Sequence, residues 1–330
     1  MSTSNGAPRA LPTTRRIRHR LGDRLLLGST LAASLAVVVA LGLIIEQVVS
    51  GSSPSIARFG LGFLWHSTWN PTLSAGAIGE NVYGAAALIY GTVVVAVIAL
   101  VIAVPLGVAI GVFLSVIAPG RAGAVIGPLV ELLAAVPSVI LGLWGIVILA
   151  PLLRSTVEPA LHAALGWIPI FGSANPTGLG LFTAGLVVAI MVLPIIASVS
   201  RDLFLAVPRE LKDGALALGA TQWEMIRGVV LDSTRAGIAA ATVLGLSRAL
   251  GEAIATTQLV GTGAAISRNL FANGDTLASR IAEQFIGAVS KLQTASLFYC
   301  ALVLLVMEIV VNLAAQLIIR RSASTRGLAI

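Results

Sequence analysis

Charged residues and cysteines are scarce in this chain of 330 residues. Only 11% of the residues are Asp, Glu, Lys or Arg, whereas soluble domains contain about a quarter. With 57% hydrophobic residues and a mean hydropathy of +0.98, the composition predicts membrane spans rather than a soluble core. The single cysteine, Cys300, lies in an apolar run, which excludes an intrachain disulfide and a cysteine-based metal cluster.

Motifs of catalytic sites are also missing from the sequence. It contains neither a Gly-x-Ser-x-Gly nucleophile elbow nor a Gly-x4-Gly-Lys-Ser/Thr phosphate loop. The three histidines, His19, His66 and His162, lie far apart in the sequence, so we expect no metal centre, cofactor or catalytic constellation. An integral-membrane enzyme would need clustered catalytic residues near an interface. We therefore expect a non-catalytic chain, and any ATP hydrolysis that drives it would reside on a partner chain.

Six apolar segments are long enough to cross a bilayer, which takes about 20 residues. They cover residues 25–49, 86–116, 124–150, 181–200, 236–260 and 296–319. The first follows a basic block at residues 15–20 and resembles a signal peptide. Because it is too long for one and no clear cleavage site follows, it is predicted to be a transmembrane helix. The predicted fold is an all-α polytopic membrane protein with about six transmembrane helices.

Lys and Arg residues are distributed unevenly along this topology. With the N-terminus inside, fifteen of them fall in cytoplasmic tails and loops and five in outer loops. This bias predicts that both termini are cytoplasmic. It also accounts for the net charge of +7 without a nucleic-acid partner. The expected regions are a basic N-tail (1–24), a first helix with its outer loop (25–85), a membrane domain (86–319) and a C-tail (320–330).

Three segments depart from a plain spanning pattern. Pro137 and Ser138 lie in the third span, where they predict a kink or a broken helix and a candidate gate. The outer loop at 151–180 is rich in Gly and Pro and is expected to be irregular. In the last outer loop, residues 277–289 form an amphipathic stretch that could lie on the surface or contact a partner.

The fifth span carries two patterns side by side. Small residues recur at every fourth position and allow close approach of another helix: Gly237, Ala241, Gly245, Ala249 and Ala253. Beside them lies a polar ladder at i, i+4 and i+8, formed by Arg248, Glu252 and Thr256. An Arg in mid-membrane costs about 2.5–3.5 kcal/mol, so the ladder is either a structural ion pair or an anion site on a transport path. We favour the second, because forked guanidinium donors suit a tetrahedral oxyanion.

Polar and small residues also mark two other spans. Glu308 lies in the sixth span with Asn312 one turn later. Glu308 could be a proton or substrate group, but an interhelical hydrogen bond is the favoured interpretation. The second span has a further row of small residues, which predicts helix packing: Ala103, Gly107, Gly111 and Ser115.

A patterned segment at residues 207–232 separates the fourth and fifth spans on the cytoplasmic side. Residues 207–218 predict a helix, Gly219 permits a sharp turn, and 220–227 predict a short second helix bearing Trp223. Ala215, Leu218 and Ile226 are expected to supply an apolar contact face. An exposed Trp on a helix–turn–helix suits the groove of a partner protein, and the alternative is an ordinary amphipathic interfacial helix pair.

This segment resembles the EAA loop of ABC importer permeases, whose pattern is Glu-Ala-Ala-x3-Gly-x9-Ile-x-Leu-Pro. Here it reads Asp213-Gly214-Ala215-x3-Gly219-x9-Val229-Val230-Leu231-Asp232. The spacing is intact, whereas Asp, Gly, Val and Asp stand in place of Glu, the first Ala, Ile and Pro. The resemblance implies that this loop couples the chain to an ATPase, through Asp213, Gly214, Ala215, Gly219, Trp223 and Leu231.

Two more motifs are similar to those of phosphate-specific ABC transporter permeases of the PstC type, which have a MetI-like core. They are Leu-Leu-Ala-Ala-Val-Pro-Ser-Val-Ile-Leu-Gly-Leu-Trp-Gly at residues 132–145 and Gly-Leu-Ser-Arg-Ala-Leu-Gly-Glu at 245–252. The resemblance implies a bacterial plasma-membrane permease with an extra N-terminal helix, in which Arg248 and Glu252 take part in phosphate movement.

The same resemblance implies four kinds of partner. They are a second homologous permease (PstA type), a cytoplasmic ATPase dimer (PstB type), an extracytoplasmic phosphate-binding protein (PstS type) and membrane lipid. A permease for sulfate or molybdate would share the coupling loop and stays an alternative. A passive channel would have no use for that loop.

Overall fold

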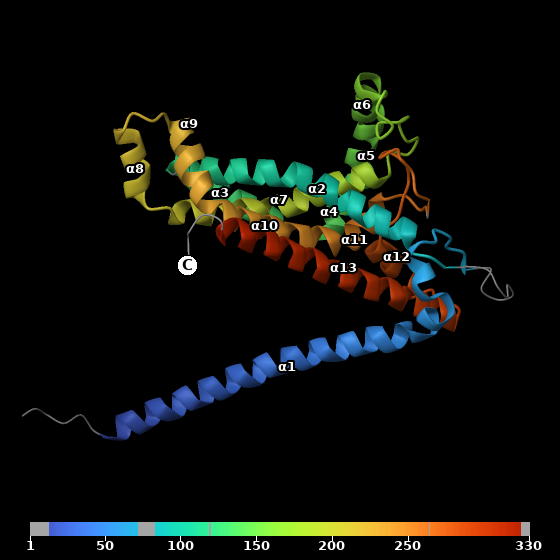
Figure 1. Cartoon of the computed structure of the whole chain (residues 1–330), viewed down its shortest axis with the longest axis horizontal. Helices are drawn as coiled ribbons and strands as arrows, with labels where there is room; N and C mark the ends of the chain where they lie inside the picture. The colour runs from blue at the N-terminus through green and yellow to red at the C-terminus, as the bar shows by residue number, and fades with distance from the viewer. Residues whose placement is uncertain (1–12, 72–82, 119, 264, 325–330) are drawn as a thin grey trace, which may run out of the picture. The chain divides into compact units, whose positions relative to one another are not determined.

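The computed structural model describes residues 13–71, 83–118, 120–263 and 265–324, and it is helical over most of them (Figure 1). Parts of the predicted tails and of the first outer loop, at 1–12, 72–82 and 325–330, lie outside the described residues. Six helical stretches are long and apolar enough to cross a membrane, which confirms the predicted fold class. They are Gly22–Leu64, Ala86–Ile117, Ser138–Leu165, Leu181–Ala206, Gln222–Leu250 and Lys291–Leu317.

The chain divides into two units, residues 1–50 and 51–330. The first is most of helix α1 (Thr13–Phe59), whose apolar side chains between residues 25 and 45 are exposed. The helix runs about ten residues beyond the predicted end at 49 and includes Pro54. The added turns belong to the second unit, where Ser55 shares a 3.1 Å hydrogen bond with Ser296. Packing in that unit therefore extends the helix past the apolar run.

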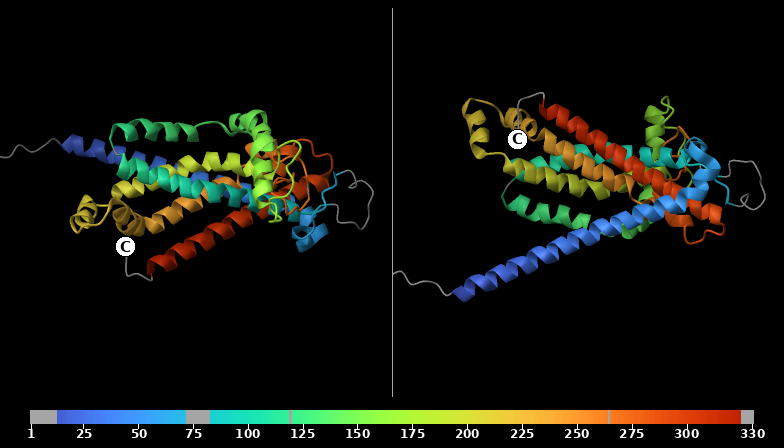
Figure 2. Two further views of the ribbon diagram at one scale, coloured as in Figure 1. Left: turned by 90° about the horizontal axis from the view of Figure 1, so that it is seen from above. Right: turned by 60° about the horizontal axis from the view of Figure 1, so that its bottom comes forward.

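Helix α7 (Leu181–Ala206) forms the centre of the second unit and is buried on most sides. It packs along α2 (Ala86–Val112) and α10 (Asp232–Leu250), as both views in Figure 2 show. Small residues allow this approach: a Cβ added at Gly107 would lie 2.9 Å from Ile196, and one at Gly111 would lie 2.9 Å from Ser200. The packing role predicted for the small residues of the second span is therefore confirmed.

The third span lies elsewhere than predicted. Helix α3 (Arg121–Ala134) ends before Pro137, and a new helical stretch, Ser138–Leu165, crosses instead of 124–150. That stretch also replaces the first half of the loop expected at 151–180. It comprises α4 (Ser138–Trp144), α5 (Ala150–Leu152) and α6 (Glu158–Leu165), joined by π-helical turns at Gly145–Leu149 and Leu153–Val157.

The predicted break at Pro137 is confirmed. Pro137 has an extended ψ of 137° and precedes the first residue of α4. A proline pushes the residue before it away from helical geometry, and its missing N–H costs nothing at a helix start. The long apolar pattern did not reveal that α3 would form a separate helix.

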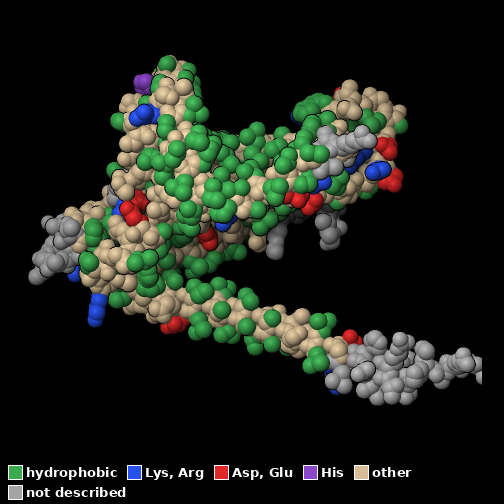
Figure 3. Space-filling model, turned by 180° about the vertical axis from the view of Figure 1, so that it is seen from behind, with side chains coloured by type: hydrophobic (Ala, Val, Ile, Leu, Met, Phe, Trp, Pro, Cys, Tyr) green, Lys and Arg blue, Asp and Glu red, His purple; other side chains and the backbone are tan. Residues whose placement is uncertain are grey.

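The two ends of the second unit are formed by different helices. One end, here called the α8 end, carries α8 (Arg209–Ala217) and α9 (Gln222–Met225). The other, the α12 end, carries α6, α12 (Leu277–Gln284) and the start of α13 (Lys291–Ser324) (Figure 1). Figure 3 shows hydrophobic side chains over the middle of this unit and charged ones toward both of its ends. Such an apolar belt is what contact with lipid or with another spanning chain requires.

Candidate functional site

A break at the end of the fifth span is the centre of the candidate site. Helix α10 ends at Leu250 and α11 (Ile254–Leu259) begins after three non-helical residues, so the continuous helix predicted at 236–260 is wrong. The Glu252 carboxylate accepts a hydrogen bond from the Ala255 N–H at 3.2 Å, in the first turn of α11. That bond satisfies one of the free donors of a helix start, which makes a break tolerable inside a span.

Arg248 and Glu252 form an ion pair across this break. Arg248 Nη2 lies 3.4 Å from Glu252 Oε2. The Glu252 side chain is only 4% exposed, whereas that of Arg248 is 51% exposed. The break therefore presents a guanidinium at the surface of this chain, with its counter-charge buried behind it.

Thr256 does not extend this pair into a ladder. Its hydroxyl donates to the Glu252 carbonyl at 2.5 Å, and the residue is 1% exposed. The predicted ladder of Arg248, Glu252 and Thr256 assumed one unbroken helix. Because the helix is broken, the Thr256 side chain points into the protein interior. Its hydroxyl instead satisfies a carbonyl that the break leaves without a helical donor.

Helix α13 contributes two polar residues beside the break. The Ser247 hydroxyl donates to Asn312 Oδ1 at 3.0 Å, which is an interhelical hydrogen bond. A Cβ added at Gly251 would lie 3.3 Å from Glu308 Oε1. The interhelical hydrogen bond that we expected of Glu308 is made by Asn312. Glu308 itself makes no hydrogen bond with the residues that the structure describes.

The small residues of α10 pack against α7, as predicted. A Cβ at Gly237 would lie 2.6 Å from Leu203, and one at Gly245 would lie 2.8 Å from Val192. Ala241 and Ala249 are buried. Ala253 lies beyond the end of the helix, so the row stops one member earlier than expected.

The helix–turn–helix predicted at 207–232 is present at the α8 end. Helix α8 is followed by Gly219 with φ +89°, a conformation that favours glycine, and Thr221 with Glu224 forms a capping box that starts α9. The second helix does not stop at 227, because a π-helical turn at Ile226–Leu231 joins α9 to α10. The second helix of the loop is therefore continuous with the fifth span.

The residues predicted to meet a partner fall into two groups. Asp213, Gly214, Gly219 and Trp223 are exposed, with Trp223 at 65%. Ala215 and Leu231 instead pack against a buried cluster at the α8 end, formed by Val112, Phe204, Val207, Met225, Ile226 and Val230. The single face expected from Ala215, Leu218 and Ile226 is therefore wrong, since Leu218 is 91% exposed and Ile226 is buried.

Lys212 fixes α8 to the end of α7. Its Nζ donates to the Phe204 carbonyl at 2.9 Å. Burial lowers the pKa of Lys212, Arg209 lowers it further, and Asp213 opposes the shift. A cation at the carboxyl end of a helix is favourable, so this contact holds the exposed residues of α8 at a set place on the bundle.

The Pro137 break lies close to the α10–α11 break in the fold, because α4 packs against α11. Gly142 permits a side chain of α11, Gln258, to approach the α4 backbone. Beside α4 lies an apolar cavity of about 310 Å³ lined by Leu133, Ile140, Leu141, Trp144 and Ile190. The two breaks are thus connected by direct packing of α4 against α11.

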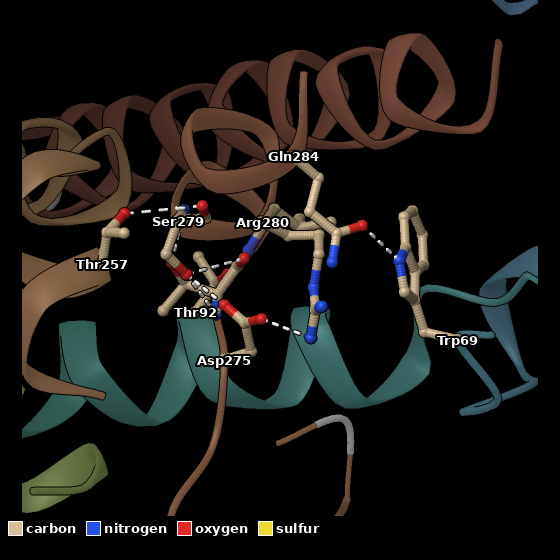
Figure 4. Close-up of polar contacts among 9 residues, drawn as sticks. Trp69, Thr92, Thr257, Asp275, Ser279, Arg280 and Gln284 are labelled. Carbon is tan, nitrogen blue, oxygen red and sulfur yellow. Dashed lines mark hydrogen bonds and ion pairs between the residues drawn. The ribbon is translucent and has the colours of Figure 1, made fainter. Parts of the chain in front are cut away.

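Sequence reasoning missed a buried polar cluster at the α12 end, which we call the outer clamp (Figure 4). Arg280 Nη2 lies 2.5 Å from Asp275 Oδ2, and both residues are buried. The Asp275 carboxylate also accepts hydrogen bonds from the Ser279 hydroxyl and, at 2.8 Å, from the Thr276 N–H. The capping box of Thr276 and Ser279 was the one local signal in the sequence.

The outer clamp joins three parts of the chain. Thr92 of α2 accepts from the Leu277 N–H at 3.0 Å, which ties α12 to α2. On the other side, the Arg280 guanidinium lies 5.5 Å from the Trp69 ring, and Trp69 Nε1 donates to Gln284 at 2.8 Å. The first turn of α12 is thus part of the core, and α12 ends at Gln284 instead of reaching 289 along the surface.

We expect Arg280→Ala to destabilise the protein by about 3–5 kcal/mol, because it leaves a buried carboxylate without its partner. Burial already raises the pKa of Asp275, and the Arg280 guanidinium opposes that rise. In the variant the pKa of Asp275 rises further, so its contribution to stability is kept at acid pH and lost as the pH increases. The loss, followed by thermal unfolding, should therefore be larger at about pH 8 than at about pH 5.

The double variant Asp275→Asn with Arg280→Met is the control for this prediction. It removes both charges, so it should unfold at a higher temperature than Arg280→Ala alone. Equal stability of the two variants at both pH values would contradict a buried, coupled ion pair.

Six apolar helical stretches in the described part of the chain, an arginine in the last turn of the fifth and an exposed helix–turn–helix are typical of a polytopic membrane permease. The family model described as "Binding-protein-dependent transport system inner membrane component" matches residues 103–324. The chain belongs to this family. It is a transmembrane permease subunit that works with an ATPase and other subunits on separate chains.

Several relatives align over nearly the whole chain. Two proteins named "Phosphate transport system permease protein PstC" are similar to it. The one from Pasteurella multocida is 39% identical, covering 95% of this chain and 97% of that protein. The one from Haemophilus influenzae is 41% identical, covering 91% and 93%. "Phosphate transport system permease protein PstC 2" of Mycobacterium tuberculosis is 37% identical, covering 91% and 92%.

A solved structure of the MetNI methionine ABC transporter, in an inward-facing conformation, also aligns with this chain. The TM-score is 0.48 at 20% identity, covering 70% of this chain and 90% of that one. Family membership rests on the sequence comparisons alone.

Proposed function

We propose that this chain imports inorganic phosphate, as one of two permease subunits of an ATP-driven transporter in a bacterial plasma membrane. The observation that carries the proposal is the half-exposed Arg248 at a break in the fifth span, with Glu252 buried behind it. Relatives that cover nearly the whole chain are named phosphate transport system permeases, which supports phosphate as the cargo.

Arg248 is suited to passing an oxyanion. Its planar guanidinium offers several N–H donors to a tetrahedral anion, and it stays charged at any working pH. Glu252 holds the guanidinium in place and neutralises it between transport events, so an arriving anion competes with a carboxylate. Binding is then favourable without being permanent, as a transport path requires. The surface of Arg248 faces the region where the second permease would complete the path.

The α8 end is the proposed site of the ATPase. Asp213 and Trp223 are exposed on a loop whose fold is fixed by Gly219 and Lys212. Because α9 runs without a stop into α10, a displacement of the loop is passed to the helix that carries Arg248. Pro137 and Ser138, next to α11, are proposed to act as a second hinge of the gate. The α8 end and both termini are proposed to be cytoplasmic, which the excess of Lys and Arg in the predicted inner tails and loops supports.

The partners proposed for this chain are a PstA-type permease, a PstB-type ATPase dimer and a PstS-type phosphate-binding protein. The alternative cargo is sulfate or molybdate, which an Arg at the same place would also attract. Competition during uptake of labelled phosphate, in cells whose other phosphate importers are deleted, separates these possibilities. An excess of unlabelled phosphate should abolish the uptake of label, and an excess of sulfate or molybdate should leave it unchanged. Loss of labelled phosphate uptake with excess sulfate would contradict the assignment.

A further inference from the structure

Glu308 of α13 stands beside the α10–α11 break without a partner. Its Oε1 is 3.3 Å from the place of an added Cβ on Gly251, so the carboxylate lies against the backbone at the break. It is half-buried, and it makes no ion pair or hydrogen bond with the residues that the structure describes. An ionisable group within a span is costly, and it is usually found facing a polar path.

The register of the two helices places Glu308 opposite Gly251, the residue before Glu252. Ser247 of α10 forms a hydrogen bond with Asn312, and Gly251, one turn later, lies against Glu308. Both contacts join the same face of the α10 side to the same face of α13. Arg248 and Glu252 each follow one residue later on the α10 side. The site therefore contains one guanidinium and two carboxylates, of which Glu252 is already paired.

The other elements that pack against α13 place their charges elsewhere. Helix α12 brings Arg280 and Glu283, but it meets α13 around Tyr299 and Cys300, two turns or more from Glu308. The end of α1 meets the same part of α13, where the Tyr299 hydroxyl donates to the Gly60 carbonyl. Among the described residues packed against α13 in this unit, Arg248 and Glu252 are thus the charged groups at the level of Glu308.

We propose that Glu308 is a specificity-determining residue, which makes the path prefer the monoanion of phosphate to the dianion. This inference rests on the proposed function. A free carboxylate beside the path repels each added negative charge of the substrate, because Coulomb repulsion scales with the charge. The monoanion also carries two hydroxyls that can donate charge-assisted hydrogen bonds to Glu308, whereas the dianion keeps only one and is repelled more strongly.

The test uses the complete transporter in proteoliposomes, with saturating phosphate and binding protein. The initial rate of phosphate uptake, divided by the amount of assembled complex, is measured while the pH is varied only on the side of the binding protein, between about 6.5 and about 8. The natural chain should transport faster at the lower pH by roughly threefold or more, and Glu308→Gln should bring this ratio close to one. Glu308→Asp keeps the charge and should keep the ratio. Glu283→Gln, which removes an exposed carboxylate of α12, is the matched control and should also keep it.

An unchanged pH ratio in assembled Glu308→Gln overturns the proposal. If that variant does not assemble, Glu308→Asn replaces it, because it also removes the charge and leaves a smaller amide at the break. A fall in the ratio then supports the proposal, and an unchanged ratio overturns it. A natural complex that moves sulfate or molybdate but no phosphate would instead refute the proposed function, before any variant is compared.

Discussion

Replacing Arg248 by alanine is expected to lower phosphate uptake about 10- to 100-fold in a transporter that still assembles. Hydrogen bonds to a charged group contribute about 1.5–3 kcal/mol, and about 1.4 kcal/mol corresponds to a tenfold change in rate. The variant also leaves Glu252 buried without its counter-ion, so a carboxylate alone would face the anion. Initial rates of labelled phosphate uptake, divided by the amount of assembled complex, measure this effect.

Three further variants separate binding of the anion from simple charge balance. Arg248→Lys keeps the positive charge but loses the paired N–H donors of the guanidinium. Phosphate uptake by this variant should therefore lie between that of the natural chain and that of Arg248→Ala. Glu252→Gln should reduce uptake less than Arg248→Ala, because the guanidinium remains. Arg235→Ala is the matched control, since Arg235 lies on the same helix in an exposed pair with Asp232 at 3.2 Å. Such pairs contribute little, so uptake should be unchanged. Uptake at the natural rate in assembled Arg248→Ala would refute the anion path.

Replacing Gly219 by proline is expected to uncouple ATP hydrolysis from phosphate uptake, while membrane insertion continues. Gly219 has φ +89°, whereas a proline ring fixes φ near −65°, so the turn between α8 and α9 cannot keep its shape. Asp213 and Trp223 would then no longer be presented together. The amount of phosphate taken up per ATP hydrolysed, in the presence of the binding protein, should fall at least about tenfold. A fall of this size corresponds to a cost of about 1.4 kcal/mol for distorting the turn.

Gly214→Ala is the control for the Gly219 variant. An added Cβ meets nothing within 4 Å at either position, so the two sites differ in backbone conformation rather than in space. Gly214 lies inside α8, where alanine is favoured by about 1 kcal/mol and is also the residue of the EAA pattern. Coupling in Gly214→Ala should match or exceed that of the natural chain. Normal coupling in Gly219→Pro would show that the turn does not transmit the ATPase cycle.

Much of the fold was predictable because its cause is local. The spans follow from apolar length, the turn at Gly219 from the freedom of glycine, and the break at Pro137 from the missing N–H. The packing of α2 and α10 on α7 follows from small residues repeating at every fourth position. Hydropathy gave wrong helix ends where packing contacts or a proline, rather than apolar length, set the end of a helix. Contacts with α13 extend α1 to Phe59, and Pro137 divides the third apolar run into two helices.

The candidate site was predicted in its residues but not in its shape. Arg248 and Glu252 stand out because charges in an apolar run are rare, and their pairing needed only a spacing of four. At the break, the Glu252 carboxylate accepts a hydrogen bond from the backbone N–H of Ala255 in α11. Helical propensity alone does not predict this side-chain contact. Glu308 and the outer clamp depend on neighbours far away in the sequence, such as Gly251 for Glu308 and Trp69 for Arg280. No short sequence pattern predicts such contacts.

Reconstitution of the whole transporter tests the central claim most directly. The chain would be placed in proteoliposomes with its proposed second permease and ATPase, and labelled phosphate would be supplied with the phosphate-binding protein. Phosphate should accumulate against its gradient only when ATP and the binding protein are both present, and the Arg248→Ala complex should accumulate about 10- to 100-fold less. Accumulation of sulfate or molybdate in place of phosphate, or passage of phosphate without ATP, would contradict a phosphate importer.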